Sequence, residues 1–474
     1  MPVRRVRVCV PLAAVFLVAA CCAAQETHSP RSADPAQTTP DAKTGEKPAF
    51  NPKDLIANAH EIEKDVEQLR GWKFKHEVKT AVYTETQLRR FIEKRLFEED
   101  YGDGRLEATE ALLRMTGMIP ADCDLRKTIM DVLLNQIGGF YDPATKGFYM
   151  LQRQGVDYGA FVNNMLIAHE LTHALDDQYV DLDKLMKSHE PTEDWSLAIG
   201  SVVEGSATVL MQRYALLAQT KGTFDAEQIG RVAASEMQRA QILFDSPRYF
   251  TTLMANYLCG MFFMTRNQPV IALPGAAETM QRNVRAATSD PPVSTEQILH
   301  PDKYWNRAER DDPVLVNDQD VERMLAHDGR FVVHKNTLGE LLCAVLTTPD
   351  DESFDILLSA APSYWTNDAA TGWGGDRFFL LAEGKDAAAA KRDLKGLRGV
   401  WLTTWDTPTD RDEFVEDYAS ERGDPKRSLI KLSKRGAVYL FGFSERERNE
   451  LTKQLAAAAP RFTKDGKPWS PDGD

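Results

Sequence analysis

The chain has few cysteines, few histidines and no long apolar run beyond its first residues. After the N-terminal segment only Cys123, Cys259 and Cys343 remain, and this odd, widely spaced set is not a disulfide framework, although one pair could be bridged. Lys and Arg number 57 against 71 Asp and Glu, which gives a net charge of -14. Because phosphate binding needs clustered Lys and Arg, this balance argues against nucleic acid as a partner.

The N-terminal residues predict export of the protein. Three arginines precede an apolar run over 8–20 and small residues follow it, which is the pattern of a secretory signal over 1–21. The run is shorter than the roughly 20 residues needed to span a bilayer. Residues 18–21 also resemble a bacterial lipobox, in which Cys21 is lipidated, and simple cleavage near Ala24 is the alternative. Both alternatives take the protein across the inner membrane, and the first makes it a lipoprotein that faces the periplasm or the exterior.

Composition and periodicity predict the domain organisation. Residues 22–52 are rich in Pro, Thr, Ser, Asp and Lys, which predicts a disordered tether. Apolar residues at helical spacing predict a mainly α-helical domain with a small hairpin over 53–337, and alternating strand-like and helical segments predict a smaller C-terminal α+β unit over 338–474. The expected fold class is therefore α+β. The expected helices cover 53–70, 86–98, 105–118, 124–137, 195–215, 226–245, 247–266, 408–420 and 444–458, and the expected C-terminal strands lie near 378–381, 400–405 and 437–443.

The motif with the clearest chemistry is His-Glu-x-x-His, within HELTHALDDQ at 169–178. A helix turns by about 100° per residue, so His169, Glu170 and His173 share one side, opposite an apolar stripe that includes Leu171 and Leu175. Two histidines at this spacing can hold one zinc ion, and the glutamate between them can activate water. A helix with two surface histidines is the alternative. The chain has only 9 histidines, and two of them lie here on the face opposite the stripe, which favours a metal site.

Glu204 is the expected third protein ligand. His-His-Glu is an established zinc ligand set that leaves a fourth position for water. Glu204 lies in an otherwise uncharged stretch, 196–211, where an unpaired carboxylate would be costly to bury. Gly200, Gly205, Ser206 and Ala207 are small, and we expect them to let this helix approach the metal-binding helix closely.

Three polar residues lie one helical turn beyond the ligands. Asp176 and Asp177 follow His173, and Thr208 follows Glu204. Such groups can orient metal ligands by hydrogen bonding, and polar groups on a helix surface are the alternative. The aromatic segment 139–150, with an Asp-Pro turn and a following glycine, predicts a hairpin close before the metal-binding helix. It is either an edge that pairs with an extended substrate or an ordinary ribbon packed on the core.

Two residues are candidates to stabilise a developing oxyanion. Tyr257 lies three residues before Gly260 on an expected helix, and a buried tyrosine with a structural hydrogen bond is the alternative. His300 follows a short helix that starts near Ser294 and must stop before Pro301. It is either a donor to substrate or a cap at the helix end.

These motifs together resemble the gluzincin branch of zinc metallopeptidases, specifically the peptidase-MA-like bacterial proteins. The resemblance covers most of the chain from about 130 onward and is carried by Gly139-Phe140-Tyr141-Asp142, HELTHALDDQ at 169–178, Glu204-Gly205-Ser206-Ala207-Thr208, residues 294–301 and Gly372-Trp373-Gly374-Gly375-Asp376. It implies that His169, His173 and Glu204 bind one Zn²⁺ ion and that Glu170 is the general base. Many relatives carry an acidic residue where Ser206 stands.

The expected function is zinc-dependent hydrolysis of a peptide or protein substrate by a metal-activated water. One alternative is an envelope lipoprotein that uses a zincin-like fold as a binding or assembly module without catalysis. Another is hydrolysis of a non-peptide amide, such as a cell-wall link. Glu170 favours an enzyme, because a scaffold that only binds would not need a base beside the ligands.

Overall fold

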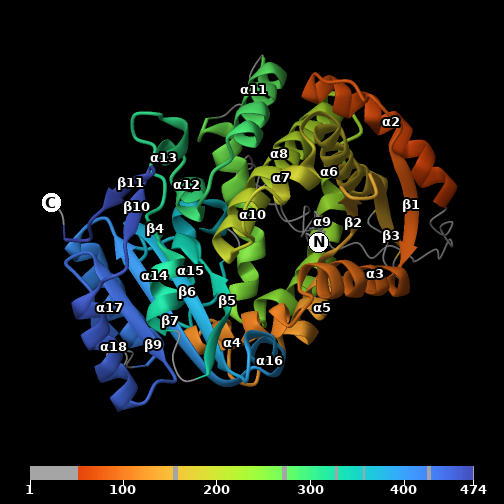
Figure 1. Cartoon of the computed structure of the whole chain (residues 1–474). Helices are drawn as coiled ribbons and strands as arrows, with labels where there is room; N and C mark the ends of the chain where they lie inside the picture. The colour runs from red at the N-terminus through yellow and green to blue at the C-terminus, as the bar shows by residue number, and fades with distance from the viewer. Residues whose placement is uncertain are drawn as a thin grey trace, which may run out of the picture.

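A computed structural model describes residues 52–152, 159–268, 275–325, 329–355, 358–423 and 429–472. The expected signal segment, Cys21 and nearly all of the expected tether lie outside these ranges, so they stay predictions. Within the described ranges, no helix combines the length and the apolar character needed to cross a membrane. The fold class is α+β, as predicted, with a helical part followed by a sheet-rich C-terminal part (Figure 1).

The helices that precede the metal-binding motif match the predicted ones closely. They are α2 (Pro52–Arg70), α3 (Glu85–Ile92), η2 (Glu93–Asp100), α4 (Arg105–Thr116) and α5 (Leu125–Gln136). The predicted helix over 86–98 is α3 continued directly by η2, a π-helix. Thr84 starts α3 with a capping box, in which its hydroxyl accepts from the Gln87 N–H and the Gln87 side chain accepts from the Thr84 N–H.

The predicted hairpin is present and belongs to a three-stranded sheet. Its strands are β2 (Gly139–Asp142) and β3 (Gly147–Gln152), and β1 (Lys79–Thr84) lies parallel to β3, so the strand order is β1-β3-β2. Sequence reasoning missed β1, because its partner strand is distant along the chain and its six residues carry little alternation. Within the described residues, β2 pairs with β3 alone and is an outer strand.

A group of packed helices forms the middle of the molecule. They are α6 (Gly159–Val180), α7 (Leu182–Met186), α8 (Glu193–Thr220), α9 (Ala226–Phe244), α10 (Arg248–Thr265), α11 (Ala276–Ser289), α12 (Thr295–Leu299) and α13 (Asp302–Trp305). Both α6 and α8 are buried over most of their length, which explains why apolar residues occupy several faces of each helix. Ser294 caps α12 through the Gln297 N–H, and α12 ends before His300, as predicted.

The glycines of α8 serve a different contact from the predicted one. A Cβ added to Gly205 would lie 2.2 Å from the backbone of Gly260 on α10, and one added to Gly260 would lie 2.2 Å from the Ser201 carbonyl. Gly200 likewise faces the Asn256 side chain. The expected close approach to α6 is therefore wrong for Gly200 and Gly205, whereas Ser206 does contact α6 through Asp176. Because successive residues of a helix point in different directions, Glu204 faces α6 while Gly205 faces α10.

The C-terminal part is built on a five-stranded antiparallel sheet with the order β5-β6-β7-β9-β8. Its strands are β5 (Arg330–Asn336), β6 (Trp373–Glu383), β7 (Lys395–Trp405), β8 (Leu429–Lys431) and β9 (Gly436–Phe441). A second, small sheet joins β4 (Leu315–Val316), β10 (Phe462–Lys464) and β11 (Lys467–Trp469). The remaining helices are α14 (Asp318–Leu325), α15 (Gly339–Thr347), η4 (Leu358–Ala360), η5 (Pro362–Tyr364), α16 (Ala387–Asp393), α17 (Pro408–Glu421) and α18 (Glu445–Ala457).

The five-stranded sheet shares one of its faces with the helical part. Along β6, Phe378 and Leu380 belong to the large core that includes the helices, whereas Phe379 and Leu381 belong to a smaller core with α14 and α18. This alternation follows from the two-residue period of a strand. The sheet begins at β5, before the expected boundary at 338, and the two parts have a continuous core rather than separate ones.

Candidate metal centre

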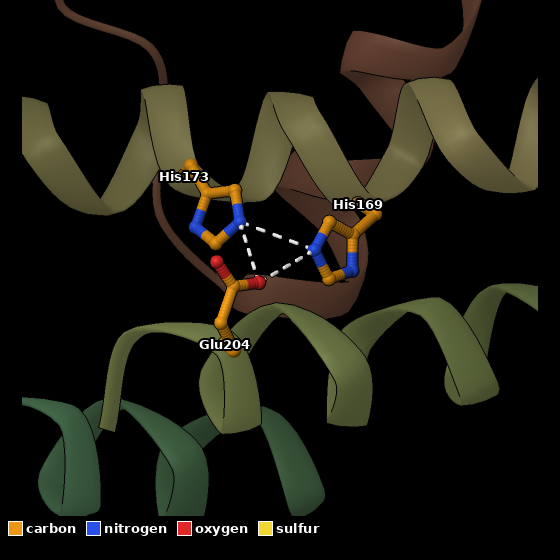
Figure 2. A group of neighbouring side chains, drawn as sticks. All are labelled: His169, His173 and Glu204. Carbon is orange, nitrogen blue, oxygen red and sulfur yellow. Dashed lines mark hydrogen bonds and ion pairs between the residues drawn. The ribbon is translucent and has the colours of Figure 1, made fainter. Parts of the chain in front are cut away.

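Two buried histidines and a buried carboxylate converge from neighbouring helices (Figure 2). His169 and His173 project from α6, and Glu204 projects from α8. The Nε2 atom of His169 is 3.1 Å from Oε2 of Glu204 and 3.1 Å from Nε2 of His173. The Nε2 atom of His173 is 3.4 Å from the same carboxylate oxygen. The structure therefore brings together the three residues that the sequence predicts as metal ligands.

The separations fit a single zinc ion. Ligand atoms placed about 2.0–2.1 Å from a tetrahedral zinc ion are about 3.3 Å from one another. The three separations, from 3.1 to 3.4 Å, lie close to that value. Nitrogen and carboxylate oxygen are also the donor types of catalytic zinc sites. The donor set therefore fits the metal that the sequence predicts.

The electrostatic environment favours the protonation states that a metal ligand needs. Burial alone would raise the pKa of Glu204, but His173 and His169 lower it to about 2. Burial lowers the pKa of His169, and hydrogen bonding to Glu204 offsets part of this effect. These shifts favour an anionic carboxylate and a neutral imidazole, and a metal ion would have to replace the proton that His169 Nε2 shares with Glu204.

Glu170 lies on the same helix and is completely buried. Neither of its carboxylate oxygens has a hydrogen-bond partner among the described residues. Burial raises the pKa of Glu170 well above its ordinary value, and the charge of Glu204 raises it further, while the Tyr141 backbone N–H, which approaches the carboxylate without forming an aligned hydrogen bond, lowers it. Since buried polar groups are almost always satisfied, an unpaired carboxylate beside a candidate metal centre indicates a group kept for a partner other than the protein.

The structure brings one of the two candidate oxyanion donors to the site. The Tyr257 ring, on α10, is stacked at 6.0 Å from the His169 ring, centroid to centroid. His300, in contrast, pairs with Glu340 of α15, with 2.8 Å between Nε2 and Oε1, and makes no hydrogen bond or ion pair with the three ligand residues. Glu340 also accepts a hydrogen bond from Thr366. His300 therefore lies at the predicted helix end, in a contact with the C-terminal part.

Asp176 and Asp177 are not surface groups, and each joins a different element to α6. Asp177 accepts hydrogen bonds from the Tyr141 hydroxyl, at 2.6 Å, and from Lys146 Nζ, at 2.8 Å, so it fixes the β2–β3 hairpin beside the metal-binding helix. Thr208 is buried, and its hydroxyl has no hydrogen-bond partner within the described part of the chain. None of the three donates to or accepts from a ligand histidine, so their contact with the ligands is indirect.

Arg70 is a site residue that sequence reasoning missed. Its Nη2 atom donates to Oδ2 of Asp176 at 2.9 Å and to the Ser206 hydroxyl at 2.7 Å, and Ser206 donates to the same Asp176 oxygen at 2.7 Å. Burial lowers the pKa of Arg70, and the charge of Asp176 opposes that shift. This arginine ends α2, far from the motif in sequence, so no local pattern indicates its contact with Asp176 and Ser206.

A second acidic group does not need a metal ion. Glu296, Asp311 and Asp406 lie close enough together to hold one. Lys303 already supplies the positive charge, because its Nζ atom is 2.6 Å from Glu296 and 3.4 Å from each of the two aspartates. Among the described residues, the ligand trio on α6 and α8 is therefore the better metal site.

Comparison with known proteins adds a match in the C-terminal part alone. Residues 323–439, from the end of α14 to β9, match a family model described as a domain of unknown function (DUF8575). No curated protein and no solved structure matches the chain. The matched segment does not include His169, His173 or Glu204, so the argument for the metal centre rests on its geometry.

Proposed function

We propose that this protein is a zinc-dependent peptidase of the gluzincin type, in which His169, His173 and Glu204 hold one zinc ion. The observation that carries the proposal is the convergence of these three ligands beside the buried, unpartnered carboxylate of Glu170. A binding module would need the ligands but not this carboxylate. If Cys21 is lipidated, the protein acts at the cell envelope on peptide or protein substrates.

The residues of the chain divide the work of hydrolysis. A bound zinc ion supplies Lewis-acid activation of water and of the scissile carbonyl. Glu170 accepts the proton of the attacking water and delivers it to the leaving amine. Tyr257, beside the His169 ring, donates a hydrogen bond to the developing oxyanion. The contact of His300 with Glu340 gives it a structural role instead.

The β2 strand is the proposed edge for the substrate backbone. It is an outer strand of its sheet, and Asp177 holds its Tyr141 beside the metal-binding helix. An extended peptide can add to such an edge through main-chain hydrogen bonds. The hairpin would then align the scissile bond with the ligand trio.

Replacement of Glu170 tests the proposal. In the Glu170→Gln variant we expect zinc content equal to that of the wild type and loss of peptide cleavage by at least about 100-fold, because a general base contributes about that factor or more. Zinc is measured by elemental analysis, and cleavage by mass spectrometry of a peptide library.

Glu309→Gln is the matched control, because Glu309 is an exposed glutamate of the same charge. It should leave zinc content and cleavage unchanged. Retained cleavage in Glu170→Gln would exclude Glu170 as the base. Zinc bound by a wild-type protein that cleaves no peptide would favour a binding module instead.

A further inference from the structure

A cavity of about 280 Å³ adjoins the candidate metal centre. Glu204 and Tyr257 are part of its wall. These two residues belong to the two main parts of the wall, which are one face of α8 over 193–204 and α10 over 249–257. Residues of α3, η2 and α5, with single residues from neighbouring segments, complete the wall. We name this cavity the α8–α10 channel.

The residues that line the channel range from partly exposed ones to the buried Glu204. Glu193 and Glu204 are separated by about 16 Å along the helix axis at 1.5 Å per residue. Because the Tyr249 hydroxyl donates to Glu193 and Gly205 packs on Gly260, α8 and α10 run side by side in the same direction. Glu193 and Tyr249 are partly exposed, whereas Glu204 is buried.

The wall between the two ends is mainly apolar. It includes Leu96 from η2, Val132 and Leu133 from α5, Leu197 from α8 and Leu253 from α10. Apolar side chains that leave water for such a wall stabilise the complex, whereas polar side chains find few hydrogen-bond partners there. A volume of about 280 Å³ lies at the lower limit of small-molecule sites, so it can take one or two side chains of a peptide rather than a whole segment. A folded protein surface cannot enter a passage that lies between helices.

We propose that the α8–α10 channel receives one or two apolar side chains of an extended peptide, and that it thereby holds the peptide backbone at the metal centre. The inference rests on the proposed peptidase function and names its substrate class. Unfolded or partly unfolded apolar stretches are then the substrates, and intact folded domains are not. Leu133 and Ser196 line the channel and are not proposed ligands, so a bulky side chain at either position tests the channel without removing a ligand.

Peptide binding tests the channel separately from catalysis. Labelled pentapeptides of Leu, Val and Phe, or of Ser and Gln, are titrated into the Glu170→Gln protein with zinc added, and fluorescence anisotropy is measured. We expect the apolar peptide to bind at least about tenfold more tightly, since burial of one large apolar side chain gives about that factor. The same preference should persist without zinc, because the walls are formed by protein.

A variant with a tryptophan in the channel is compared with one that has a tryptophan at an exposed position. Leu133→Trp should weaken apolar binding at least about tenfold by occupying the space that the peptide needs. Leu315→Trp, at an exposed leucine of β4, should leave binding unchanged. Ser196→Trp is the second variant if Leu133→Trp does not fold, as judged by circular dichroism. Equal binding of the two peptides, or no effect of a folded channel variant, would overturn the inference.

Two further outcomes separate this inference from the proposed function. If the apolar preference and the Leu133→Trp effect are found but wild-type protein cleaves no peptide, the channel stands and the peptidase function fails. If wild-type protein cleaves both peptides equally and Leu133→Trp changes nothing, the function stands and the channel assignment fails. Dodecanoate that binds in the channel more tightly than the apolar peptide would also overturn the assignment, in favour of an acyl chain.

Discussion

The Arg70 guanidinium joins the two helices that carry the proposed ligands. It binds Asp176, one turn beyond His173 on α6, and Ser206, two residues beyond Glu204 on α8. Because Arg70 ends α2, the N-terminal helix is also tied to the metal centre. Arg70 is therefore a positioning residue for both ligand helices.

Removal of Arg70 should destabilise the protein and loosen the metal centre. Arg70→Met leaves Asp176 as a buried, unpaired carboxylate, and loss of one partner of a buried pair costs about 3–5 kcal/mol. We expect a lower free energy of unfolding in urea and weaker zinc binding by calorimetry. The double variant Arg70→Met, Asp176→Asn should regain part of both. Equal stability and zinc affinity in Arg70→Met and wild type would contradict this role.

At the scale of single residues, the sequence predicted which three side chains converge, but it did not predict the residues that support them. His169, Glu170 and His173 share one helix, so their relation follows from helical geometry alone. Glu204 could be inferred because an isolated carboxylate in an apolar stretch needs a partner. The partners of Asp176 and Asp177 come from α2 and from the hairpin, and no local pattern shows which distant segments will pack there.

The crossing of α8 and α10 sets the position of Glu204. Gly205 and Gly260 lie in contact at this crossing, so a methyl group on either one must separate the helices. Glu204, adjacent in sequence to Gly205, would move with α8. The packing of α10 against α8 therefore sets the position of Glu204, although α10 supplies no residue to the proposed ligand trio.

Gly205→Ala should weaken stability and zinc binding together. The new Cβ would lie 2.2 Å from the Gly260 backbone. Such overpacking costs about 1–3 kcal/mol, and the shift of α8 should lower zinc affinity. Gly230→Ala on α9 is the control, because an added Cβ there meets nothing within 4 Å, and it should be neutral or stabilise slightly. Unchanged thermal unfolding and zinc binding in Gly205→Ala would show that the crossing has no such influence.

Local signals predicted most elements, and distant pairing explains the rest. The capping boxes, the turn glycines and the apolar periodicity mark α3, α17 and the β2–β3 hairpin. The missed strands β1 and β5 obtain their hydrogen bonds from segments far along the chain. The contact between Gly205 and Gly260 was missed for the same reason, since a glycine does not reveal which helix it faces.

At the scale of the whole molecule, Asp194 connects the helical and C-terminal parts. It starts α8 and accepts hydrogen bonds from the Thr295 N–H, at 2.7 Å, and the Thr295 hydroxyl, at 2.6 Å. A Cβ on Gly339, at the start of α15, would lie 1.9 Å from Oδ1 of Asp194. Gly339 also has φ +81°, so this junction requires glycine for both space and backbone conformation. One core cluster includes residues of both parts, and β5 starts at Arg330, so the predicted boundary at 338 does not separate two independent cores.

The Asp194 junction should make stability fall as pH rises. Burial raises the pKa of Asp194 to about 7, although the Thr295 hydrogen bonds lower it. In the unfolded chain an aspartate titrates near pH 4, so between about pH 4 and pH 7 the folded state retains a proton that the unfolded state has lost. The resulting loss of stability is on the order of 4 kcal/mol across this range.

Asp194→Asn should remove this loss, because an amide has no proton to release and can still accept from Thr295. The free energy of unfolding in urea is measured for wild type and variant from pH 4 to pH 8. The variant should gain stability relative to wild type as pH rises through this range. A constant difference between the two proteins would contradict the pKa shift of Asp194.

Zinc stoichiometry tests the central claim most directly. Purified protein is saturated with zinc, dialysed and analysed for metal per chain, as wild type, as Glu204→Ala and as Asp406→Asn. The last variant alters the second acidic group, where Lys303 supplies the cation. We expect one zinc ion per chain in wild type and Asp406→Asn, and a substoichiometric amount in Glu204→Ala. Zinc-free wild type, or full retention in Glu204→Ala, would contradict a metal centre formed by His169, His173 and Glu204.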